Sequence, residues 1–229
     1  MTNTDKKEKP DLLKQLASVV SHEIRNPLAI ISNSLYFVKT KLGAGGAVID
    51  PKVAKHLGII ESEVKHTNGV IEEMLAFTRA RELQPAPASV NSAIKDLAGS
   101  FPVTPEVALK LVPDPADPCV NADMEAIGYA MRCVLTNAVQ AMPEGGSLML
   151  ECSHDAGLAH MTFTDRGPGF TGGDGEKAFE PFFTTKPRGI GLGLTIARKY
   201  LEQQGGTARA ENVPGGGARV VLSLPLAKS

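Results

Sequence analysis

The sequence predicts an α+β protein in which a helical hairpin precedes an α/β sandwich. The first part of the chain, to residue 84, has apolar residues at alternating steps of four and three, which is the heptad pattern of packed helices. Beyond residue 90, short apolar segments typical of strands alternate with two helical patterns. The proline-rich stretch "QPAPAS" lies between these parts. We therefore expect one domain over 1–84, a linker over 85–90 and a second domain over 91–229.

Charge and composition exclude several classes of protein. The net charge is −1 over 229 residues, so nothing indicates a nucleic-acid partner or an anionic membrane surface. No apolar run reaches the roughly 18 residues of a membrane span. The three cysteines, Cys119, Cys133 and Cys152, are far apart and suggest neither a zinc site nor a disulfide framework. We interpret them as buried thiols of a cytoplasmic protein.

Two apolar stripes predict the hairpin. After the helix-breaking stretch "GAGGAVIDP", Asp50 is a candidate N-cap and Pro51 a candidate first helical residue. The stripes consist of Ile24, Leu28, Ile31, Leu35, Val38 and Leu42 on the first helix and of Val53, Leu57, Ile60, Val64, Thr67, Ile71 and Met74 on the second. Two helices alone bury too little apolar surface, so we expect two hairpins to pair as a homodimeric four-helix bundle. The alternative is that both stripes pack on the second part of the same chain.

The segment "SHEIRNPL", residues 21–28, interrupts the regular pattern of the first helix. Pro27 removes a backbone donor and crowds the carbonyl of Glu23, at a cost of roughly 3 kcal/mol, so we expect a bend there. His22 lies two positions from the seam residues on either side, about 200° round the helix from each, and so points away from the seam. Asn26, four residues on, shares its face. A histidine outside the core is available to a partner.

Short apolar segments indicate the strands of the second part. They cover 107–112, 148–152, 158–164, 207–211 and 218–224. Helical patterns cover 123–142 and 192–204. This mixture predicts a sheet with helices on one side.

A glycine-rich stretch precedes the last predicted helix. In "GIGLGL", Gly189, Gly191 and Gly193 would let backbone N–H groups approach a phosphate chain at a helix N-terminus, where the dipole favours anions. The spacing is neither that of a dinucleotide fold nor that of a Walker A loop. Alone, this motif would indicate only a glycine-rich surface loop.

Two further motifs fit a nucleotide. In "DRGPGF", Asp165 ends a strand and could accept a hydrogen bond from an adenine amino group, while the following glycines make room for the ring. In "LTNAVQAM", Asn137 could supply a hard oxygen to Mg²⁺. Lys186 and Arg188 precede the last glycines, where a mobile lid could bring them to phosphate. The alternative for these two side chains is that they are solvated lid charges.

Taken together and in this order, the motifs resemble those of the catalytic core of a sensor histidine kinase of a two-component system. "SHEIRNPL" is similar to the H box, "LTNAVQAM" to the N box, "DRGPGF" to the first G box, "FEPFFTTK" to the F box and "GIGLGL" to the second G box. The resemblance extends over about residues 12–226, and five motifs in the family's order are a specific signal.

The resemblance implies a role for each residue. His22 would take the γ-phosphoryl group of ATP, Glu23 would orient or deprotonate its ring, and Asn26 would position water for dephosphorylating a bound partner. Asn137 would ligate Mg²⁺, and Asp165 would bind adenine. Gly167 and Gly169 would lie beside the base. Gly189, Gly191 and Gly193 would hold the phosphates and hinge the lid.

The implied function is that of an ATP-dependent protein-histidine kinase with ATP and Mg²⁺ as cofactors. It would autophosphorylate His22, pass the phosphoryl group to an aspartate of a response regulator, and could also dephosphorylate that regulator. The regulator is expected to dock on the hairpin around and below His22. The residues leave open whether His22 is phosphorylated by its own subunit or by its neighbour. They also leave open whether the chain is the excised core of a membrane or soluble receptor, or a soluble kinase controlled by a partner.

One position departs from the family pattern. Related ATPases such as DNA gyrase and the heat-shock chaperones carry a glutamate that activates water four residues before the metal-binding asparagine, and histidine kinases usually carry an asparagine there. Here the residue is Cys133, which favours phosphotransfer over hydrolysis. The alternatives are a conformational ATPase, an inactive dimeric scaffold and a serine kinase of the anti-sigma type. His22 with its hairpin, and the intact motifs of Asn137 and Asp165, argue against them.

Overall fold

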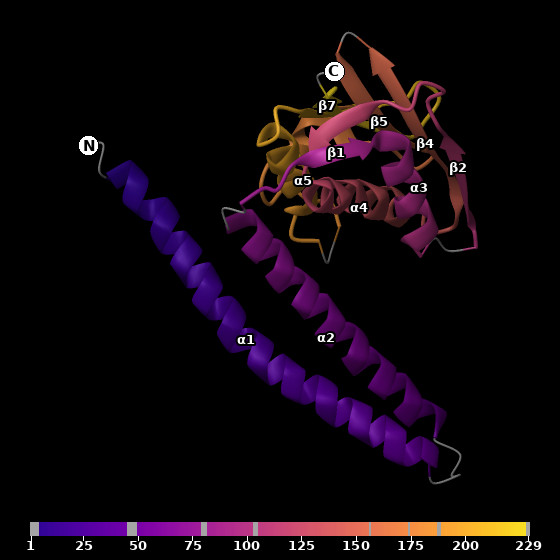
Figure 1. Cartoon of the computed structure of the whole chain (residues 1–229). Coiled ribbons are helices and arrows are strands. Elements are labelled where there is room, and N and C mark those ends of the chain that lie inside the picture. Colours follow the sequence, from indigo (N-terminus) through magenta and orange to yellow (C-terminus); the bar gives the residue numbers. More distant parts are fainter. Residues whose placement is uncertain are drawn as a thin grey trace. The chain divides into compact units, whose positions relative to one another are not determined.

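The computed structural model describes the chain except residues 1–4, 45–49, 79–81, 103–104, 156, 174, 187–188 and 228–229, and it describes side chains at the remaining positions except 5–23, 44 and 173. The chain divides into two compact units, Met1–Ala80 and Arg81–Ser229 (Figure 1). The first is helical and the second mixes helices and strands, which confirms the predicted fold class. No helix in the described part of the chain combines the length and the apolar character that crossing a membrane requires.

The first unit is a hairpin of two long helices, α1 (Asp5–Ala44) and α2 (Pro51–Thr78). α1 runs without a break through Pro27 and is curved (Figure 1). The predicted start of α2 is confirmed, because Asp50 Oδ1 accepts a hydrogen bond from the backbone N–H of Lys52 at 2.7 Å.

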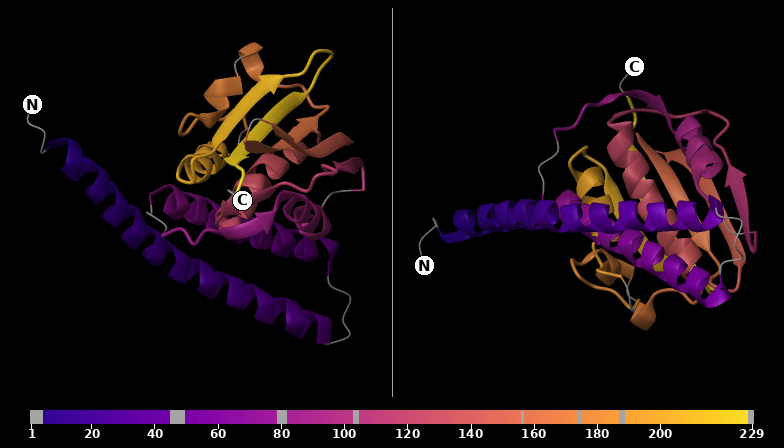
Figure 2. Two further views of the ribbon diagram at one scale, coloured as in Figure 1. Left: turned by 45° about the horizontal axis from the view of Figure 1, so that its top comes forward. Right: turned by 90° about the horizontal axis from the view of Figure 1, so that it is seen from below.

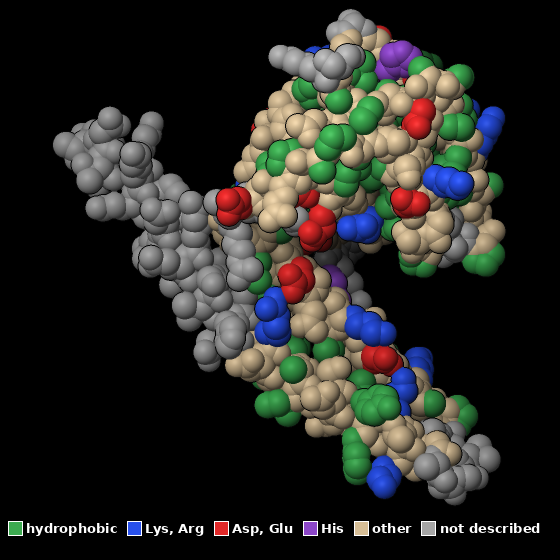
Figure 3. Space-filling model, in the orientation of Figure 1, with side chains coloured by type: hydrophobic (Ala, Val, Ile, Leu, Met, Phe, Trp, Pro, Cys, Tyr) green, Lys and Arg blue, Asp and Glu red, His purple; other side chains and the backbone are tan. Residues whose placement is uncertain are grey.

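The heptad positions of the two helices differ in exposure. Leu35, Val64 and Ile71 are buried, with 7%, 7% and 3% of their surfaces exposed. The alternate positions, spaced by multiples of seven, stay exposed: Ile24, Ile31 and Val38 on α1, and Val53, Ile60 and Met74 on α2. Figure 3 shows apolar side chains among charged ones on the hairpin face in view. Half of each stripe is therefore covered within the hairpin and half is not.

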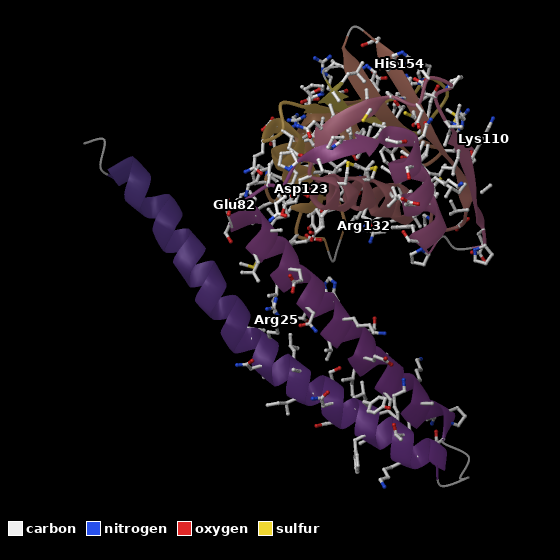
Figure 4. All side chains as sticks on the ribbon, viewed as in Figure 1. Arg25, Glu82, Lys110, Asp123, Arg132 and His154 are labelled. Carbon is white, nitrogen blue, oxygen red and sulfur yellow. The ribbon has the colours of Figure 1, made fainter. Side chains whose placement is uncertain are left out.

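Ion pairs connect the two helices at exposed positions. Arg25 points from α1 towards α2 (Figure 4), where its Nη2 pairs with Glu72 Oε1. Lys39 pairs with Glu61 at 2.7 Å. Hydrogen bonds from Lys39 and then Lys65 lower the pKa of Glu61. Solvent screens such pairs, so the apolar seam contributes most to the stability of the hairpin.

The second unit is a five-stranded sheet with helices on one face (Figure 2). The strand order is β2-β4-β5-β7-β6, with β2 parallel to β4 and the other neighbours antiparallel. The strands are β2 (Val107–Val112), β4 (Gly146–Asp155), β5 (Leu158–Asp165), β6 (Thr207–Asn212) and β7 (Ala218–Pro225). The helices are α3 (Val90–Ser100), α4 (Met124–Gln140) and α5 (Gly193–Glu202), with two short 3₁₀ helices, η1 (Thr171–Gly173) and η2 (Gly175–Phe179). The five predicted strands and two predicted helices are confirmed, with somewhat different ends.

Alternation along the strands separates core from solvent. Ala159, Met161 and Phe163 of β5 are buried in the core that the sheet forms with the helices. The last residue of β5, Asp165, lies in register with Leu148 near the start of β4. Because β4 begins shortly after α4 ends, the end of β5 lies beside the end of α4.

The segment 85–90 is not a linker, which corrects the prediction. β1 (Ala86–Ser89) pairs antiparallel with β3 (Cys119–Ala122) in a second, two-stranded sheet. Ser89 also caps α3, because its side chain accepts a hydrogen bond from the backbone N–H of Ser92 at 3.0 Å. Proline is compatible with an edge strand, where some backbone N–H groups need no partner. The predictions from sequence also omit α3.

The cysteines match the expectation of buried thiols only in part. Cys152 on β4 is buried, and this burial raises the pKa of its thiol to about 11. Cys133 is half-buried and Cys119 is exposed. Cys119 begins β3, whose alternate residues Val120 and Ala122 point into the core, and so it lies on the outer face.

Candidate functional site

Asp165 ends β5 as a buried carboxylate, with 6% of its surface exposed. Its Oδ1 accepts hydrogen bonds from the backbone N–H groups of Gly167 at 2.8 Å and Ala218 at 3.1 Å. Among the described residues, Oδ2 has no hydrogen-bond partner. One carboxylate oxygen is thus fixed by the fold, and the other can accept a hydrogen bond from a ligand.

The loop that follows β5 packs closely against its neighbours. Asn212 Oδ1 accepts a hydrogen bond from the backbone N–H of Phe170 at 2.6 Å, and Asn212 Nδ2 donates one to its carbonyl at 3.0 Å. Gly169 has a φ of 77°, and a Cβ there would lie 2.7 Å from Asn212 Oδ1. A Cβ at Gly167 would lie 3.1 Å from the Cβ and from the carbonyl oxygen of Ala141, just past α4. The loop therefore requires glycine at position 169, and a side chain at position 167 would require Ala141 to shift by a few tenths of an ångström.

A pocket of about 300 Å³ opens beside this loop. It is lined by Ala141, Met142, Pro143, Glu144, Gly145, Arg166, Gly167 and Pro168. Since Arg166 directly follows Asp165, the pocket adjoins the buried carboxylate. Apart from Glu144 and Arg166 the lining is small or apolar, and such a surface beside a carboxylate suits a flat heterocyclic ring.

Two amide side chains near the end of α4 converge on one cation. Asn137 Oδ1 accepts a hydrogen bond from Lys186 Nζ, and Gln140 Oε1 accepts one from the same nitrogen at 2.8 Å. The predicted metal ligand and the predicted lid lysine are thus in direct contact. Amide oxygens are hard ligands of the kind that Mg²⁺ accepts, so the ammonium marks a place that suits a cation. Among the described residues, no group of three or more His, Cys, Asp or Glu side chains could hold a metal ion.

The lid is the segment that contains Lys186 and precedes α5, and its path depends on Gly191. Its φ is 69°, and a Cβ there would lie 2.4 Å from the carbonyl oxygen of Phe183. Its carbonyl accepts a hydrogen bond from the backbone N–H of Phe182 at 3.0 Å, a residue with the uncommon φ of 66°. The backbone N–H of Gly189 donates to the carbonyl of Lys186 at 3.2 Å. These bonds fold the lid back on itself before α5 begins.

α5 begins at Gly193 without a side-chain cap, because Leu192 at the N-cap supplies no hydrogen bond. Its first backbone N–H groups therefore suit an anionic ligand. A Cβ at Gly193 would lie 3.7 Å from Cys133 Sγ. The departure from the family pattern at position 133 thus lies beside this helix start.

An arginine anchors the segment before the lid. The guanidinium of Arg198 on α5 lies 3.8 Å from the ring centroid of Phe179. It also donates hydrogen bonds to Glu176 Oε2 at 2.6 Å and to the carbonyl of Ala208 at 3.0 Å. Thr195 Oγ1 donates to the carbonyl of Phe179 at 3.0 Å. The predictions from sequence omit these contacts, together with those of Gln140 and Asn212, because helix and strand periodicity does not identify a polar partner.

The remaining predicted residues lie on the hairpin or in the lid. His22 and Glu23 belong to α1, and their side chains lie outside the described residues. Asn26 is exposed one turn further along α1, and Arg188 lies outside the described residues. The structure therefore brings Asp165 together with Gly167 beside the end of α4, and Lys186 together with Asn137 on α4. The roles of all these residues stay predictions.

Two family models match the chain in succession. Residues 12–83 match the His Kinase A (phospho-acceptor) domain, and residues 122–228 match the histidine kinase-, DNA gyrase B-, and HSP90-like ATPase. The first match lies on the hairpin and the second covers the part that carries Asp165 and Asn137.

Known proteins resemble the chain over almost its whole length. It is 30% identical to the sensor histidine kinase ZraS of Escherichia coli O157:H7, over 96% of this chain and 48% of ZraS. It is 29% identical to the signal transduction histidine-protein kinase AtoS of Escherichia coli (strain K12), over 93% of this chain and 35% of AtoS. The crystal structure of the histidine kinase ThkA in complex with the response regulator protein TrrA matches with a TM-score of 0.68 and 26% identity, over 96% of this chain and 64% of that chain. The chain spans half or less of the length of the two curated relatives, and it belongs to the histidine kinase family, whose phospho-acceptor and ATPase domains it carries in succession.

Proposed function

We propose that this chain is the phosphotransferase core of a sensor histidine kinase. It uses ATP and Mg²⁺ to phosphorylate His22 and then transfers the phosphoryl group to an aspartate of a response regulator. ATP and such a regulator are found in the cytoplasm, so the proposal also assigns the chain to that compartment.

The arrangement of Asp165 and Asn137 carries the proposal. Asp165 bonds to Gly167, and Gly167 approaches Ala141, four residues beyond Asn137. Four residues of helix rise about 6 Å. A carboxylate suited to an adenine amino group and an amide suited to a metal ion therefore lie along the same helix end, as a nucleotide with metal-bound phosphates requires.

The phosphates have two further sources of stabilisation in this unit. The uncapped start of α5 at Gly193 offers backbone N–H groups. Lys186, already in contact with Asn137, can supply positive charge. Mg²⁺ held by Asn137 would offset phosphate charge and polarise the γ-phosphoryl group.

His22 acts as the nucleophile. One ring nitrogen bonds to the γ-phosphorus, while the bond from that phosphorus to the bridging oxygen breaks and ADP leaves. An imidazole with the ordinary pKa of about 6.5 is largely neutral near pH 7, as a nucleophile must be. Glu23 takes the proton from the other ring nitrogen, and Asn26 positions water when the regulator is dephosphorylated.

The regulator docks on the face of α1 that carries His22. Helix geometry places Asn26, Ile30, Tyr36 and Phe37 within about 80° of His22 round the axis. Ile30, Tyr36 and Phe37 are 67%, 73% and 60% exposed. An exposed apolar surface next to the phosphorylated residue suits a protein partner, and ThkA has been crystallised with its regulator TrrA.

A second copy covers the exposed heptad positions. Ile31 and Ile60 are 44% and 43% exposed although they repeat at the spacing of a packed seam. Two hairpins that pair through these positions form the predicted four-helix bundle. Ile31→Glu should convert the dimer to a monomer in sedimentation analysis, and a wild-type chain that is monomeric at all concentrations would contradict the proposal.

Incubation with radiolabelled ATP and Mg²⁺ tests the kinase reaction. The wild type should acquire label that is acid-labile and alkali-stable, and His22→Gln should acquire none. His56→Gln is the matched control, because His56 is an exposed histidine of α2. Label that persists in His22→Gln would reject His22 as the nucleophile, and steady phosphate release without label would favour an ATPase.

A further inference from the structure

The side chain of Lys186 connects the lid to α4. Lys186 Nζ donates to Asn137 Oδ1 and to Gln140 Oε1, and the second bond is 2.8 Å long. Lys186 is half-buried, although the four residues before it are exposed. Its backbone is held as well, because its N–H donates to Thr184 Oγ1 at 3.1 Å and its carbonyl accepts from Gly189.

The two oxygens form a binding site for a cation. Each is the negative end of a neutral amide dipole, and together they bind one ammonium group. A metal ion that binds Asn137 through the same oxygen requires that oxygen to exchange the lysine for the metal. A metal ion and Lys186 therefore compete for Asn137.

We propose that the ammonium of Lys186 occupies this cation-binding site when no nucleotide is bound. Gln140 is the positioning residue that keeps the ammonium there. The inference rests on the proposed function, because it concerns how the nucleotide site is held before Mg²⁺ and nucleotide bind. Lys186 would leave Asn137 when that oxygen holds a metal ion, and its ammonium would then be available to the phosphates.

The proposal separates the roles of two residues one turn apart. Asn137 would hold the metal, whereas Gln140 contacts only Lys186 among the side chains that the structure describes. Removing Gln140 Oε1 therefore weakens the state without nucleotide and leaves the metal ligand in place. Mg²⁺-dependent binding of a nucleotide should become tighter, whereas loss of a metal or phosphate ligand would make it weaker.

Gln140→Leu tests this in binding measurements with ADP, which cannot phosphorylate the protein. The dissociation constant of ADP is measured by calorimetry, once with Mg²⁺ and once with a chelator. The constant with chelator divided by the constant with Mg²⁺ gives the contribution of the metal. The ratio should rise about three- to tenfold, the size expected for one hydrogen bond to a charged group in a partly exposed place. Gln203→Leu is the control, because Gln203 is an exposed glutamine at the far end of α5. It should leave the ratio unchanged.

A second measurement follows the lysine directly and needs no nucleotide. Acetylation of lysines by an amine-reactive ester is followed by mass spectrometry, with exposed Lys110 as internal reference (Figure 4). Lys186 should react at least about twofold faster in Gln140→Leu than in the wild type, and Lys110 should react equally in both.

The outcomes separate this inference from the proposed function. A wild type that binds no ADP with Mg²⁺ would overturn both. A wild type that binds ADP with help from Mg²⁺, combined with an unchanged or smaller ratio in Gln140→Leu, would overturn the role of Gln140 and Lys186 alone. Equal acetylation of Lys186 in the two proteins would also overturn it.

Discussion

Asp165 and Ala218 are joined by a 3.1 Å hydrogen bond from the backbone N–H of Ala218 to carboxylate Oδ1, across 53 residues of sequence. The bond connects the end of β5 to the start of β7. It also fixes the carboxylate plane, so that Oδ2 is presented to a ligand in one orientation.

Asp165→Asn should separate folding from base recognition. The amide carbonyl can still accept from Gly167 and Ala218, so the thermal unfolding midpoint should change little. The amide NH₂ replaces Oδ2 and cannot accept from the adenine amino group, so ATP affinity should fall by about 10- to 100-fold. ITP carries an oxygen in place of that amino group, so its affinity should fall less than that of ATP. Equal losses of affinity for both nucleotides in binding assays would contradict this role of Asp165.

Pro27→Ala should change the ratio of kinase to phosphatase activity. α1 continues through Pro27, so the proline denies the Glu23 carbonyl its helical donor next to His22. Alanine restores that bond and favours one arrangement of the helix over another. Both rates are measured on one preparation with a regulator. Pro51→Ala is the control, because Pro51 is the first residue of α2, where no donor is needed. An unchanged ratio in Pro27→Ala would reject the idea.

Asp114 should contribute stability that is lost in acid. Its hydrogen bond to His154 (labelled in Figure 4), together with one from the backbone of Ala116, lowers the pKa of its carboxyl group. The folded state therefore binds a proton less readily than the unfolded chain, whose aspartates have a pKa of about 3.9. The contribution is present above that pH and falls as the pH drops through the lower folded value. Urea unfolding of the wild type and Asp114→Asn should give curves that converge below about pH 4, and a gap that widens there would contradict this.

Cys119 and Cys152 should differ in reactivity. Burial raises the pKa of the Cys152 thiol to about 11, whereas Cys119 is exposed. At pH 8, iodoacetamide should alkylate Cys119 and spare Cys152 until the protein unfolds. Since the unfolded thiol ionises near pH 8.5 and the folded one only near pH 11, Cys152 should also reduce stability as the pH rises between these values. Cys119→Ser identifies the labelled site, and rapid alkylation of Cys152 in the folded protein would refute the prediction.

Local chemistry explains which features around the candidate site could be predicted from sequence. Asp165 at a strand end and Gly193 at a helix start were each marked by residue type and by a change of periodicity. The contacts between motifs were not. Lys186 and Asn137 are 49 residues apart, and no local pattern indicates that a lid side chain crosses to a helix.

The strand β1 and the helix α3 were not predicted for a related reason. The stretch that forms β1 has the composition of a connector, and only its pairing with β3 makes it a strand, with Ala86 opposite Ala122. The heptad stripes were more informative because their period is local. They predicted Leu35 and Val64 as seam residues without any knowledge of the turn between them.

The pairing of β1 with β3 sets where this chain can be divided or joined to another. A fragment that starts at residue 91 would lose β1, the Ser89 cap of α3 and the hydrogen bond from the backbone N–H of Gln84 to Asp123. It would also expose the unpaired edge of β3, a template for association with other chains. Hybrid kinases built on this ATPase domain should therefore be joined upstream of Gln84, so that the proline-containing strand travels with the sheet that it completes.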